Sequence, residues 1–589
     1  MRSFYRKVQP ILAAAMSVVA IVALENGTER ITTVHFLLLC ALFLAIYGSP
    51  AVKAATKHWE SRVIGFLFSG SIALSRDWLG VYLEDATTNG LFWMAVKCAG
   101  LYVIALALLD ILYDRLLSGK NVGRKPVSRK GVGICFLGSF ALLWCTYLVV
   151  YLNQYPGSLT PDMGGQLSEI LGFSPYENAN PLFTTLFIGI WVKLGCALFG
   201  TVNAGVGTYT FVQFTLAAGA FAYCVSVIYK NTRHRALTLF AHLLFNCMPY
   251  HIMYAVGMWK DTFFAICFLL AMTYLWDCTR KEKLTRRHYI TSFALVLAAS
   301  LARNSGWSSL LMLGLALYAY CAVKNRRSPG NVFSALKKLS AAVIGAAAAA
   351  VLTISVIYPA LGVTYHGSVV VGMSVPIQQI SRVLAQEQWV RASDKALIQE
   401  AVSFDIEEFP ERYQPGLSDP IKISINAEQV KQNLPAYFKL WVRLGREHPK
   451  VYLDAFVDLT RGYWDFESAD WIWDNRIWDN ELDVYRDAKL YPDWDDSWTL
   501  SYLFRRPYSY VLQNSAIILW TLLISLGYAN MKKNRLAELL MIPILMIYFG
   551  LMLTSPVASF RYVYGAAVCF PLIISFSGVP AEYPQKEFV

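Results

Sequence analysis

Long apolar runs, separated by short polar or basic loops, recur along most of the chain. A run of about 18 or more apolar residues is long enough to cross a bilayer as a helix. The pattern therefore predicts an all-α polytopic membrane protein with about 13–15 membrane segments. The predicted spans lie near 8–24, 31–50, 91–113, 132–152, 204–229, 237–256, 262–277, 289–303, 306–323, 339–361, 509–529, 536–553 and 556–577. Two more runs are ambiguous: 61–76 is short enough to lie flat, and 181–199 is apolar enough to cross.

These runs divide the chain into four regions. Residues 1–131 form N-terminal membrane helices, residues 132–361 a membrane module whose first outer loop is 153–180, and residues 509–589 C-terminal membrane helices. Between the last two lies the segment 362–508, which is long enough for its own core. Helical patterns near 392–402 and 427–447 predict a mainly α or α+β domain there. The N-terminus resembles a signal peptide, but a second apolar run begins at Ile31, which favours an uncleaved first helix.

Basic residues cluster in the short loops between spans. They lie at Lys120–Lys130, Lys230–Arg235, Arg280–Arg287, Lys324–Lys338 and Lys532–Arg535. Such loops stay in the cytoplasm, so we expect a multi-pass protein of the cell membrane with 155–181 and 362–508 outside. If 181–199 and 204–229 both cross, however, the basic loop at 230–235 falls outside. Either one run is re-entrant or the charge rule fails there, and the sequence leaves both open.

The composition supports the membrane assignment and indicates which classes of binding partner to expect. Of 589 residues, 56% are hydrophobic and 16% charged, and the mean hydropathy is +0.41. The net charge of +12 is spread over separate loops rather than one patch, so membrane lipid is an expected partner and nucleic acid is not. None of the eleven cysteines lies between Leu361 and Tyr508, which argues against a disulfide framework, and no CxxC or His/Cys cluster indicates zinc.

The segment 362–508 is rich in tryptophan and acidic residues. Eight of the 17 tryptophans lie there. Trp464, Trp471 and Trp473 could stack on a sugar of the acceptor or donor, but an interfacial aromatic belt with a core explains them equally well. The Asp493, Asp495 and Asp496 cluster could bind a divalent cation, the one cofactor considered, although a solvated acidic loop is the commoner use of such a cluster.

The polar stretch Tyr155–Pro181 presents an acid at a predicted helix start. Thr160 suits an N-cap and Pro161 the first helical position. Asp162 then lies in the first turn, where the helix dipole favours the ionised carboxylate. Met163, Leu167, Ile170 and Leu171 follow at helical spacing with Gln166 and Glu169 on another face, which predicts an amphipathic helix on the membrane. Asp162 is a candidate base, although capping the helix is the simpler role.

More polar residues recur at the predicted outer ends of spans. Ionisable groups at membrane depth are costly, so they usually pair, line a cavity or bind something, although each alone is more often an interfacial anchor. The set comprises Asp162, Glu177, Asn178, Asn180, Lys260, Asp261, Arg303, Arg561 and Tyr562. Its three cations suit a departing lipid-linked phosphate, and Asp162 could take the proton of an acceptor hydroxyl. No nucleotide site is needed, because the activated donor already lies in the membrane.

The segments that carry these residues resemble the membrane glycosyltransferases of the GT-C superfamily. They are YPGSLTPD (155–162), NANPLF (178–183), MWKD (258–261), LARNSG (301–306), SVPIQQISRV (374–383) and SFRYVY (559–564). The pattern is similar to protein O-mannosyltransferases and lipid A aminoarabinose transferases, and more closely to an uncharacterised bacterial branch of the superfamily. Each segment is short, and their order and placement between spans carry the resemblance.

The resemblance implies a GT-C-like fold and an inverting transferase with its active site on the extracytoplasmic side. A sugar would pass from a polyprenyl-phosphate donor to a cell-envelope glycan, lipid or protein. Asp162 corresponds to the essential acid of the first outer loop, and Asp261 to an acid of the second. Lys260, Arg303, Arg561 and Tyr562 would bind the donor phosphate, with Glu177, Asn178 and Asn180 supporting the first loop. The superfamily often has His-Pro or Lys-Pro where this chain has Asn180–Pro181. Because of this difference, the resemblance does not imply that Asn180 contacts the donor phosphate.

Two other functions stay open at this point. A flippase or transporter of lipid-linked glycan could use the same cations, although many transporters have paired interrupted spans that this pattern lacks. A surface polysaccharide polymerase or ligase would place arginines in outer loops, where Arg412, Arg443, Arg446 and Arg461 are available. A purely structural membrane protein would leave the cationic span ends unexplained.

Overall fold

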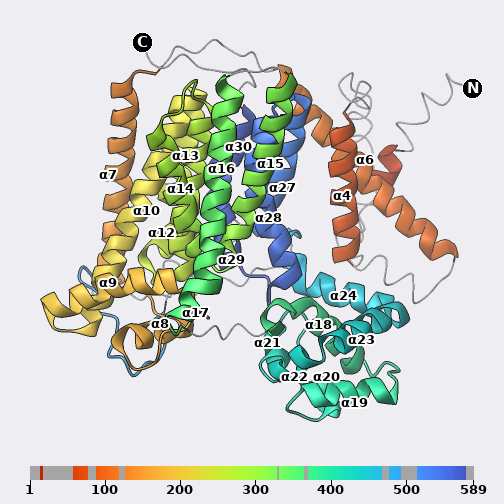
Figure 1. The fold of residues 1–589 in the computed structure, drawn as a ribbon. Coiled ribbons are helices and arrows are strands. Elements are labelled where there is room, and N and C mark those ends of the chain that lie inside the picture. Colours follow the sequence, from red (N-terminus) through yellow and green to blue (C-terminus); the bar gives the residue numbers. More distant parts are fainter. Residues whose placement is uncertain are drawn as a thin grey trace, which may run out of the picture. The chain divides into compact units, whose positions relative to one another are not determined.

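The computed structural model describes residues 13–17, 58–76, 88–118, 127–327, 331–363, 369–466, 476–491 and 514–578. Throughout these ranges the regular structure is helical, and β-structure is limited to isolated bridges. The prediction of an all-α polytopic membrane protein is therefore confirmed (Figure 1). The predicted spans near 8–24 and 31–50 lie outside the described residues, apart from the short helical stretch 13–17.

The chain forms two compact units. The first contains residues 1–123 and 523–533, and the second residues 124–522 and 534–589. In the first unit, α4 (Trp59–Ser75) and α6 (Thr88–Ser118) pack with the C-terminal half of α27 (Ser515–Met531). Tyr113 Oη donates to the Ile524 carbonyl at 2.9 Å, and Asn530 Nδ2 donates to Glu60 Oε1 at 2.6 Å. All candidate site residues belong to the second unit.

Within the described ranges, nine helical segments are long and apolar enough to cross a membrane. They are Met94–Ser118 of α6, α7 (Arg129–Asn153), α9 (Leu182–Phe199), α10 (Val202–Thr232), α13 (Lys260–Thr279), Gly306–Lys324 of α15 (Gly306–Arg327), Val332–Ala360, α28 (Arg535–Thr554) and Phe560–Gly578. The segment Val332–Ala360 comprises α16 (Asn331–Leu352), η1 (Thr353–Ile357) and α17 (Tyr358–Ala360), and Phe560–Gly578 comprises α29 (Phe560–Ala567) and α30 (Phe570–Gly578). Three other predicted segments, 61–76, 289–303 and 509–529, form shorter helices: α4, α14 (Arg286–Leu301) and α27.

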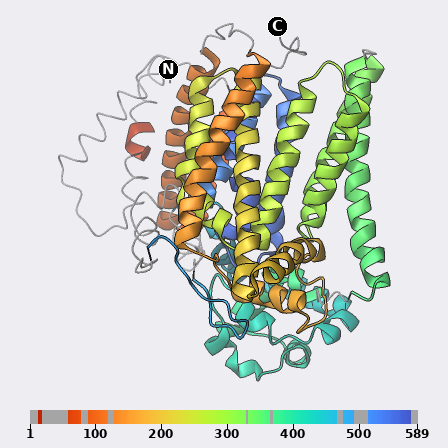
Figure 2. The same ribbon diagram turned by 90° about the vertical axis from the view of Figure 1, so that its left-hand side faces the viewer.

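Contacts between α7 and α10 give the direction of the second unit's helices. Tyr151 near the end of α7 donates to the Gly207 carbonyl near the start of α10 at 2.9 Å, and Trp144 Nε1 donates to Thr215 Oγ1 at 3.1 Å. The two helices are thus antiparallel neighbours, seen as the orange and yellow helices in Figures 1 and 2. At the far end of α10, Lys230 Nζ lies 2.7 Å from Asp277 Oδ1 near the end of α13. We call the two ends of this bundle the Asp162 end and the Lys230 end.

Helix α9 begins and ends at the Asp162 end. Its start is held there because Thr184 Oγ1 donates to the Ala302 carbonyl, and the Phe187 ring stacks on Phe263 in the first turn of α13 at 4.3 Å. Its last turns pack on the start of α10, where a Cβ built on Gly195 would lie 2.8 Å from the Gly205 Cα atom. Of the alternatives that the sequence leaves open, a non-crossing 181–199 run fits these contacts, and the basic loop 230–235 then reaches the opposite end.

The run predicted as a span at 237–256 forms two apolar helices with a break between them. Helices α11 (Arg235–Cys247) and α12 (Pro249–Val256) meet at a bend of 54°. Pro249 explains the bend, because the residue before a proline avoids the helical region and Met248 is extended at φ −74° and ψ 119°. The Gln213 side chain donates to the carbonyls of Ala255 and Gly257 and so supports the chain after the bend.

Close packing of α9 on α10 depends on small residues. A methyl group at Gly205 would lie 2.8 Å from the Val192 carbonyl oxygen and 2.6 Å from Cys196 Sγ. We expect Gly205→Ala to destabilise the protein by about 1–3 kcal/mol and to lower its thermal unfolding midpoint in detergent. Gly219→Ala is the matched control, because it lies on the same helix with open space around the added methyl. Equal midpoints for the two variants would contradict this packing.

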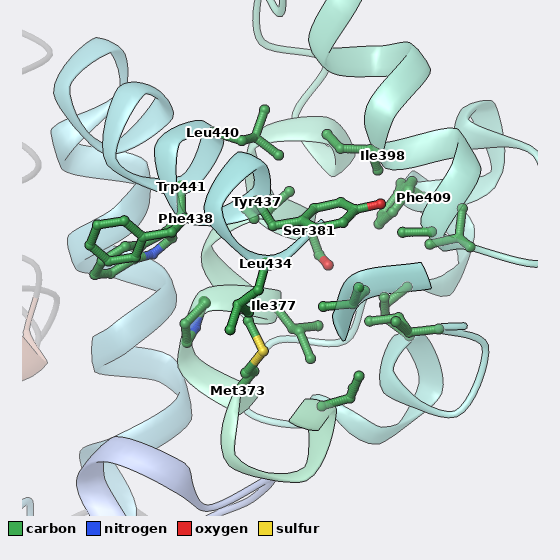
Figure 3. Close-up of a pocket in the computed structure, with 18 of the residues that line it drawn as sticks. Met373, Ile377, Ser381, Ile398, Phe409, Leu434, Tyr437, Phe438, Leu440 and Trp441 are labelled. Carbon is green, nitrogen blue, oxygen red and sulfur yellow. The ribbon is translucent and has the colours of Figure 1, made fainter. Parts of the chain in front are cut away.

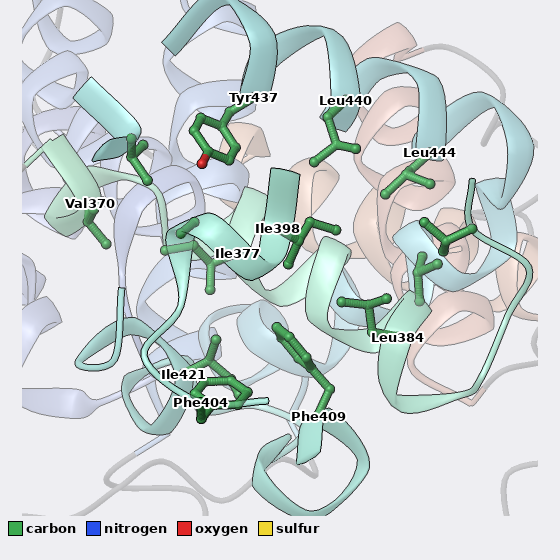
Figure 4. Close-up of a cluster of buried hydrophobic side chains, with 14 of the residues drawn as sticks. Val370, Ile377, Leu384, Ile398, Phe404, Phe409, Ile421, Tyr437, Leu440 and Leu444 are labelled. Carbon is green, nitrogen blue, oxygen red and sulfur yellow. The ribbon is translucent and has the colours of Figure 1, made fainter. Parts of the chain in front are cut away.

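The described part of 362–508 folds mainly into short helices. They are η2 (Val369–Gly372), α18 (Ser374–Ala385), α19 (Ala392–Ala401), η3 (Ile406–Glu408), α20 (Phe409–Arg412), α21 (Asp419–Lys422), α22 (Ala427–Gln432), α23 (Leu434–Glu447), α24 (Pro449–Thr460) and η4 (Arg461–Tyr463). The helices predicted near 392–402 and 427–447 are present, the second as α22 and α23. We call residues 369–463 the helical segment, and Figure 4 shows its apolar core.

Candidate active site

Helix α8 (Pro161–Leu171) begins as the sequence predicts, with Thr160 as the extended N-cap residue, Pro161 at the first position and Asp162 in the first turn. Gly172, at φ 85°, ends the helix in the left-handed conformation. The predicted polar face is only partly right. Gln166 and Glu169 are buried instead of facing water, and Gln166 Nε2 donates to Thr185 Oγ1 at 2.6 Å. The helix therefore packs into the protein and is held on α9.

Two cations hold the Asp162 carboxylate. Arg561 Nη1 donates to Asp162 Oδ2 at 3.1 Å, and Lys260 Nζ lies 3.6 Å from the same oxygen. Burial acts to raise the pKa of Asp162, but the charges and hydrogen bonds of Lys260 and Arg561 outweigh it and hold the pKa below its usual range. With 43% of its side chain exposed, Asp162 is an ionised carboxylate that a second molecule can reach.

The predicted first-loop residues position Lys260. Its ammonium donates to Asn180 Oδ1. Asn178 Oδ1 accepts a hydrogen bond from the Leu182 backbone N–H at the start of α9, and the Asn178 carbonyl accepts one from Asn304 Nδ2 at 2.9 Å. The hydrogen bond between Asn178 and Asn304 thus joins the first predicted outer loop, which contacts Lys260, to the turn that contains Arg303. Glu177 lies near Glu169 on α8, and its backbone hydrogen-bonds the Glu169 side chain.

Arg561 and Arg303 share Tyr562. Arg561 Nη2 donates to Tyr562 Oη at 2.6 Å, and its guanidinium lies 4.9 Å from the ring centre of Trp259. Arg303 Nη1 donates to the Tyr562 carbonyl at 3.0 Å, with its guanidinium 5.4 Å from the Phe264 ring centre. Planar guanidinium groups stacked on aromatic rings are fixed in direction. The structure thereby gathers residues from the start of α13, the turn between α14 and α15, and the start of α29 at one place.

Asp261 is the second acid of the cluster and is far more enclosed than Asp162. Only 5% of it is exposed, and its Oδ2 atom has no hydrogen-bond partner in the part of the chain that the structure describes. It interacts electrostatically with Arg561 and Tyr562. We call Asp162, Lys260, Asp261, Arg303, Arg561 and Tyr562 the polar cluster.

Sequence reasoning missed the segment that braces the start of this site. Residues 476–491 run along the stretch before α8: the Trp478 backbone N–H donates to the Leu159 carbonyl at 3.0 Å, and Arg486 Nη1 donates to the Gly157 carbonyl at 2.9 Å. Gly157 is needed here because its φ is +125° and an added Cβ would lie 2.9 Å from the Val256 carbonyl oxygen. No local signal links these segments, which lie more than 300 residues apart.

The sequence also matches a family. A model described as "Family of unknown function (DUF6020)" matches residues 174–579. The chain belongs to this family. No curated protein and no solved structure matches the chain. The matched region of the DUF6020 protein contains Lys260, Asp261, Arg303, Arg561 and Tyr562, whereas Asp162 precedes it.

Of the three tryptophans predicted to stack on a sugar, the structure describes Trp464. Trp464 is buried at 8% exposure, its Nε1 donates to Thr460 Oγ1, and its carbonyl accepts from Trp520 Nε1. It is thus a core residue that offers no open ring face to a sugar. Trp471, Trp473 and the acidic residues Asp493, Asp495 and Asp496 lie outside the described residues. Within the described ranges, no group of three or more His, Cys, Asp and Glu residues could hold a metal ion.

Three of the four arginines considered for a polymerase, Arg412, Arg443 and Arg461, are engaged separately in the helical segment. Arg443 Nε donates to Asp394 Oδ2 at 3.0 Å, Arg412 Nη2 lies 2.7 Å from Glu408 Oε2, and Arg461 Nη1 lies 3.7 Å from Asp458 Oδ1. Each pairs with a different carboxylate, so they do not form a common anion site like that of the polar cluster.

Glu169 is a buried acid on α8 in the DUF6020 protein. It is 7% exposed, and its Oε2 atom has no hydrogen-bond partner among the described residues. Burial raises the pKa of Glu169 from 4.5 to about 7; a hydrogen bond to the Glu177 backbone opposes the rise and the Glu177 charge adds to it. Between pH 4.5 and about 7, the native state therefore keeps a proton that the unfolded chain has lost. In this range the free energy of unfolding falls as the pH rises, and above about pH 7 it levels off.

We expect Glu169→Gln to remove this pH dependence. Above neutral pH, the free energy of unfolding of the variant should exceed that of the wild type by on the order of 3 kcal/mol, since one pKa unit corresponds to about 1.4 kcal/mol. The measurement is the thermal unfolding midpoint in detergent across the acidic to neutral range. Glu428→Gln is the control, because that carboxylate is 74% exposed. A wild type and a Glu169→Gln variant with parallel pH profiles would rule out a protonated Glu169.

Proposed function

We propose that this DUF6020 protein is an integral-membrane glycosyltransferase. It transfers a sugar from a polyprenyl-phosphate donor to a hydroxyl of a cell-envelope acceptor. The observation that carries the proposal is the exposed, ionised Asp162 carboxylate held between Lys260 and Arg561 at the end of a helical bundle. A base beside two cations suits a reaction that releases a proton from the acceptor and a phosphate from the donor.

The proposed step is a single displacement at the anomeric carbon. The acceptor oxygen forms a bond to that carbon while the bond to the phosphate oxygen breaks, and the bonding electron pair leaves with the polyprenyl phosphate. The acceptor proton passes to Asp162 and from there to water. Attack from the face opposite the leaving phosphate inverts the anomeric configuration.

Binding of the donor requires cations with capacity beyond their present partners. Arg561 uses Nη1 on Asp162 and Nη2 on Tyr562 Oη, and a guanidinium carries five N–H donors. Lys260 and Arg303 add two more positive charges, against the two carboxylates of the polar cluster. The cluster thus has one excess positive charge, which favours a phosphate anion.

The distribution of basic residues supports an extracytoplasmic site. Lys230, in the last turn of α10, and Lys281 both lie within 4 Å of Asp277 at the Lys230 end. The basic loops at this end are of the kind retained in the cytoplasm. The polar cluster belongs to the opposite end. A donor carried in the outer leaflet would reach it without crossing the bilayer, whereas a flippase would be expected to place its charges near mid-depth.

Donor turnover tests the function directly. The purified protein in detergent is offered a panel of polyprenyl-phosphate sugars with cell-envelope extract as acceptor, and release of free polyprenyl phosphate is measured. We expect release from one sugar class, and a fall of about tenfold or more in Lys260→Ala, which loses a phosphate contact. Lys422→Ala is the control, because Lys422 also pairs with an aspartate, Asp419, at 2.8 Å, but in the helical segment. No release from any donor would reject the transferase.

A further inference from the structure

An apolar cavity lies inside the helical segment, apart from the polar cluster. Its volume is about 490 Å³, within the range of roughly 300–1,000 Å³ typical of ligand sites. Helix α23 contributes Leu434, Tyr437 and Trp441, and Met373 and Ile377 come from the start of α18 (Figure 3). Ala401 of α19 lines the same space.

The cavity offers almost no hydrogen bonding to a ligand. Tyr437 Oη already donates to the Leu397 carbonyl at 3.1 Å, and Trp441 Nε1 donates to Gln379 Oε1 at 2.7 Å. Apart from these two groups, the polar side chain in the lining is the single hydroxyl of Ser381. Water needs two to four polar partners to occupy a cavity, and a sugar or peptide needs more. The lining therefore selects a hydrocarbon.

The surroundings of the cavity suit a ligand that arrives from a membrane. Two lining residues, Leu434 and Phe438, are also exposed, Phe438 to 60%, and Ile423 between lining residues Ile421 and Ile425 is 81% exposed. Large exposed apolar side chains grouped in this way mark a surface that meets lipid or a partner. Helix α18 also contacts α28, one of the helices long enough to span a membrane.

The cavity is linked to the polar cluster by a short connection. The Ser418 backbone N–H, three residues before the lining residue Ile421, donates to the Pro556 carbonyl at 2.9 Å, and Leu417 pairs with Val557. Val557 lies three residues before α29, which begins with Phe560 and Arg561.

We propose that the helical segment binds one hydrocarbon chain of a membrane lipid in this cavity. The bound chain fills the cavity among the side chains of the helical segment and so anchors the segment beside the bundle. This binding does not depend on sugar transfer, so it can be tested whether or not the protein is a transferase.

Photolabelling of the full-length protein in nanodiscs tests the proposal. One arm uses phosphatidylcholine with a diazirine in its acyl chain, and a second uses polyprenyl phosphate with a diazirine in its prenyl chain. After illumination, labelled peptides are mapped by mass spectrometry. We expect label on cavity-lining peptides within 369–447, and the arm that gives it identifies an acyl or a prenyl chain.

Filling the cavity should remove that label. Ala401→Trp places a large ring in the cavity and is expected to reduce labelling of these peptides about fivefold, with labelling of the bundle helices unchanged. Ala396→Trp is the matched control, because Ala396 is exposed on the same helix. If Ala401→Trp does not fold, Met373→Trp fills the cavity from α18 instead. Absence of label on these peptides in both arms, or equal label in the filling and control variants, would overturn the proposal.

Discussion

Replacing Asp162 with asparagine is expected to lower the rate of sugar transfer by about a thousandfold, within the range for loss of a general base. The amide keeps the size of the carboxyl group and its place in the first turn of α8, so the protein should still fold. Donor binding should not weaken, because Lys260 and Arg561 lose a competing anion and are more available to the donor phosphate. We therefore expect kcat to fall while KM for the donor stays level or decreases.

Asp419→Asn is the matched control for this variant. Its carboxylate is 47% exposed, close to the 43% of Asp162, and it also pairs with a lysine. Transfer by Asp419→Asn should equal that of the wild type. The pH profile gives a second test: because the pKa of Asp162 is lowered, its ionised form persists throughout the neutral and mildly acidic range. An Asp162→Asn variant that keeps most of its turnover would exclude Asp162 as the base.

Features set by neighbouring residues were predicted well. The start of α8 depends on Thr160, Pro161 and Asp162 alone, and each takes the position that its backbone preferences and charge dictate. The long spans follow from length and hydropathy. No local pattern in the sequence predicts the ion pair between Asp162 and Arg561, which lie 399 residues apart. The sequence did predict that both residues lie at the outer ends of spans, and the structure has both at the same end of the bundle.

Features set by distant packing were missed. An apolar helix of 18 residues has the same composition whether it crosses or lies along one end. For α9 the two are distinguished by contacts at both of its ends, Phe187 on Phe263 and Gly195 on Gly205. Burial of Glu169 likewise depends on its tertiary surroundings, which its sequence position on a polar face does not reveal. Trp464 illustrates the same limit, because an aromatic ring suits a sugar or a core equally.

Replacing Arg561 with lysine is expected to reduce kcat about a hundredfold, the size of effect seen when one charge-stabilising donor is lost. Lysine keeps the positive charge, so a purely Coulombic role predicts little change. The guanidinium, however, bonds Asp162 through Nη1 and Tyr562 through Nη2 while stacked on Trp259, and one ammonium on a flexible stem cannot reproduce that geometry. The measurement is kcat and KM for polyprenyl phosphate release.

Arg535→Lys is the matched control for Arg561→Lys, because Arg535 Nη1 lies 2.6 Å from a carboxylate oxygen of Glu538 but is 53% exposed and begins α28. It should retain wild-type turnover. If Arg561→Lys also retains it, the role of Arg561 is charge alone and the directed contacts to Asp162 and Tyr562 are not needed for transfer. If Arg561→Lys instead raises KM alone, the guanidinium serves donor binding equally in the ground and transition states. A fall in kcat is the result that the fixed orientation of Arg561 predicts, since a positioned donor acts on the charge that develops on the departing phosphate.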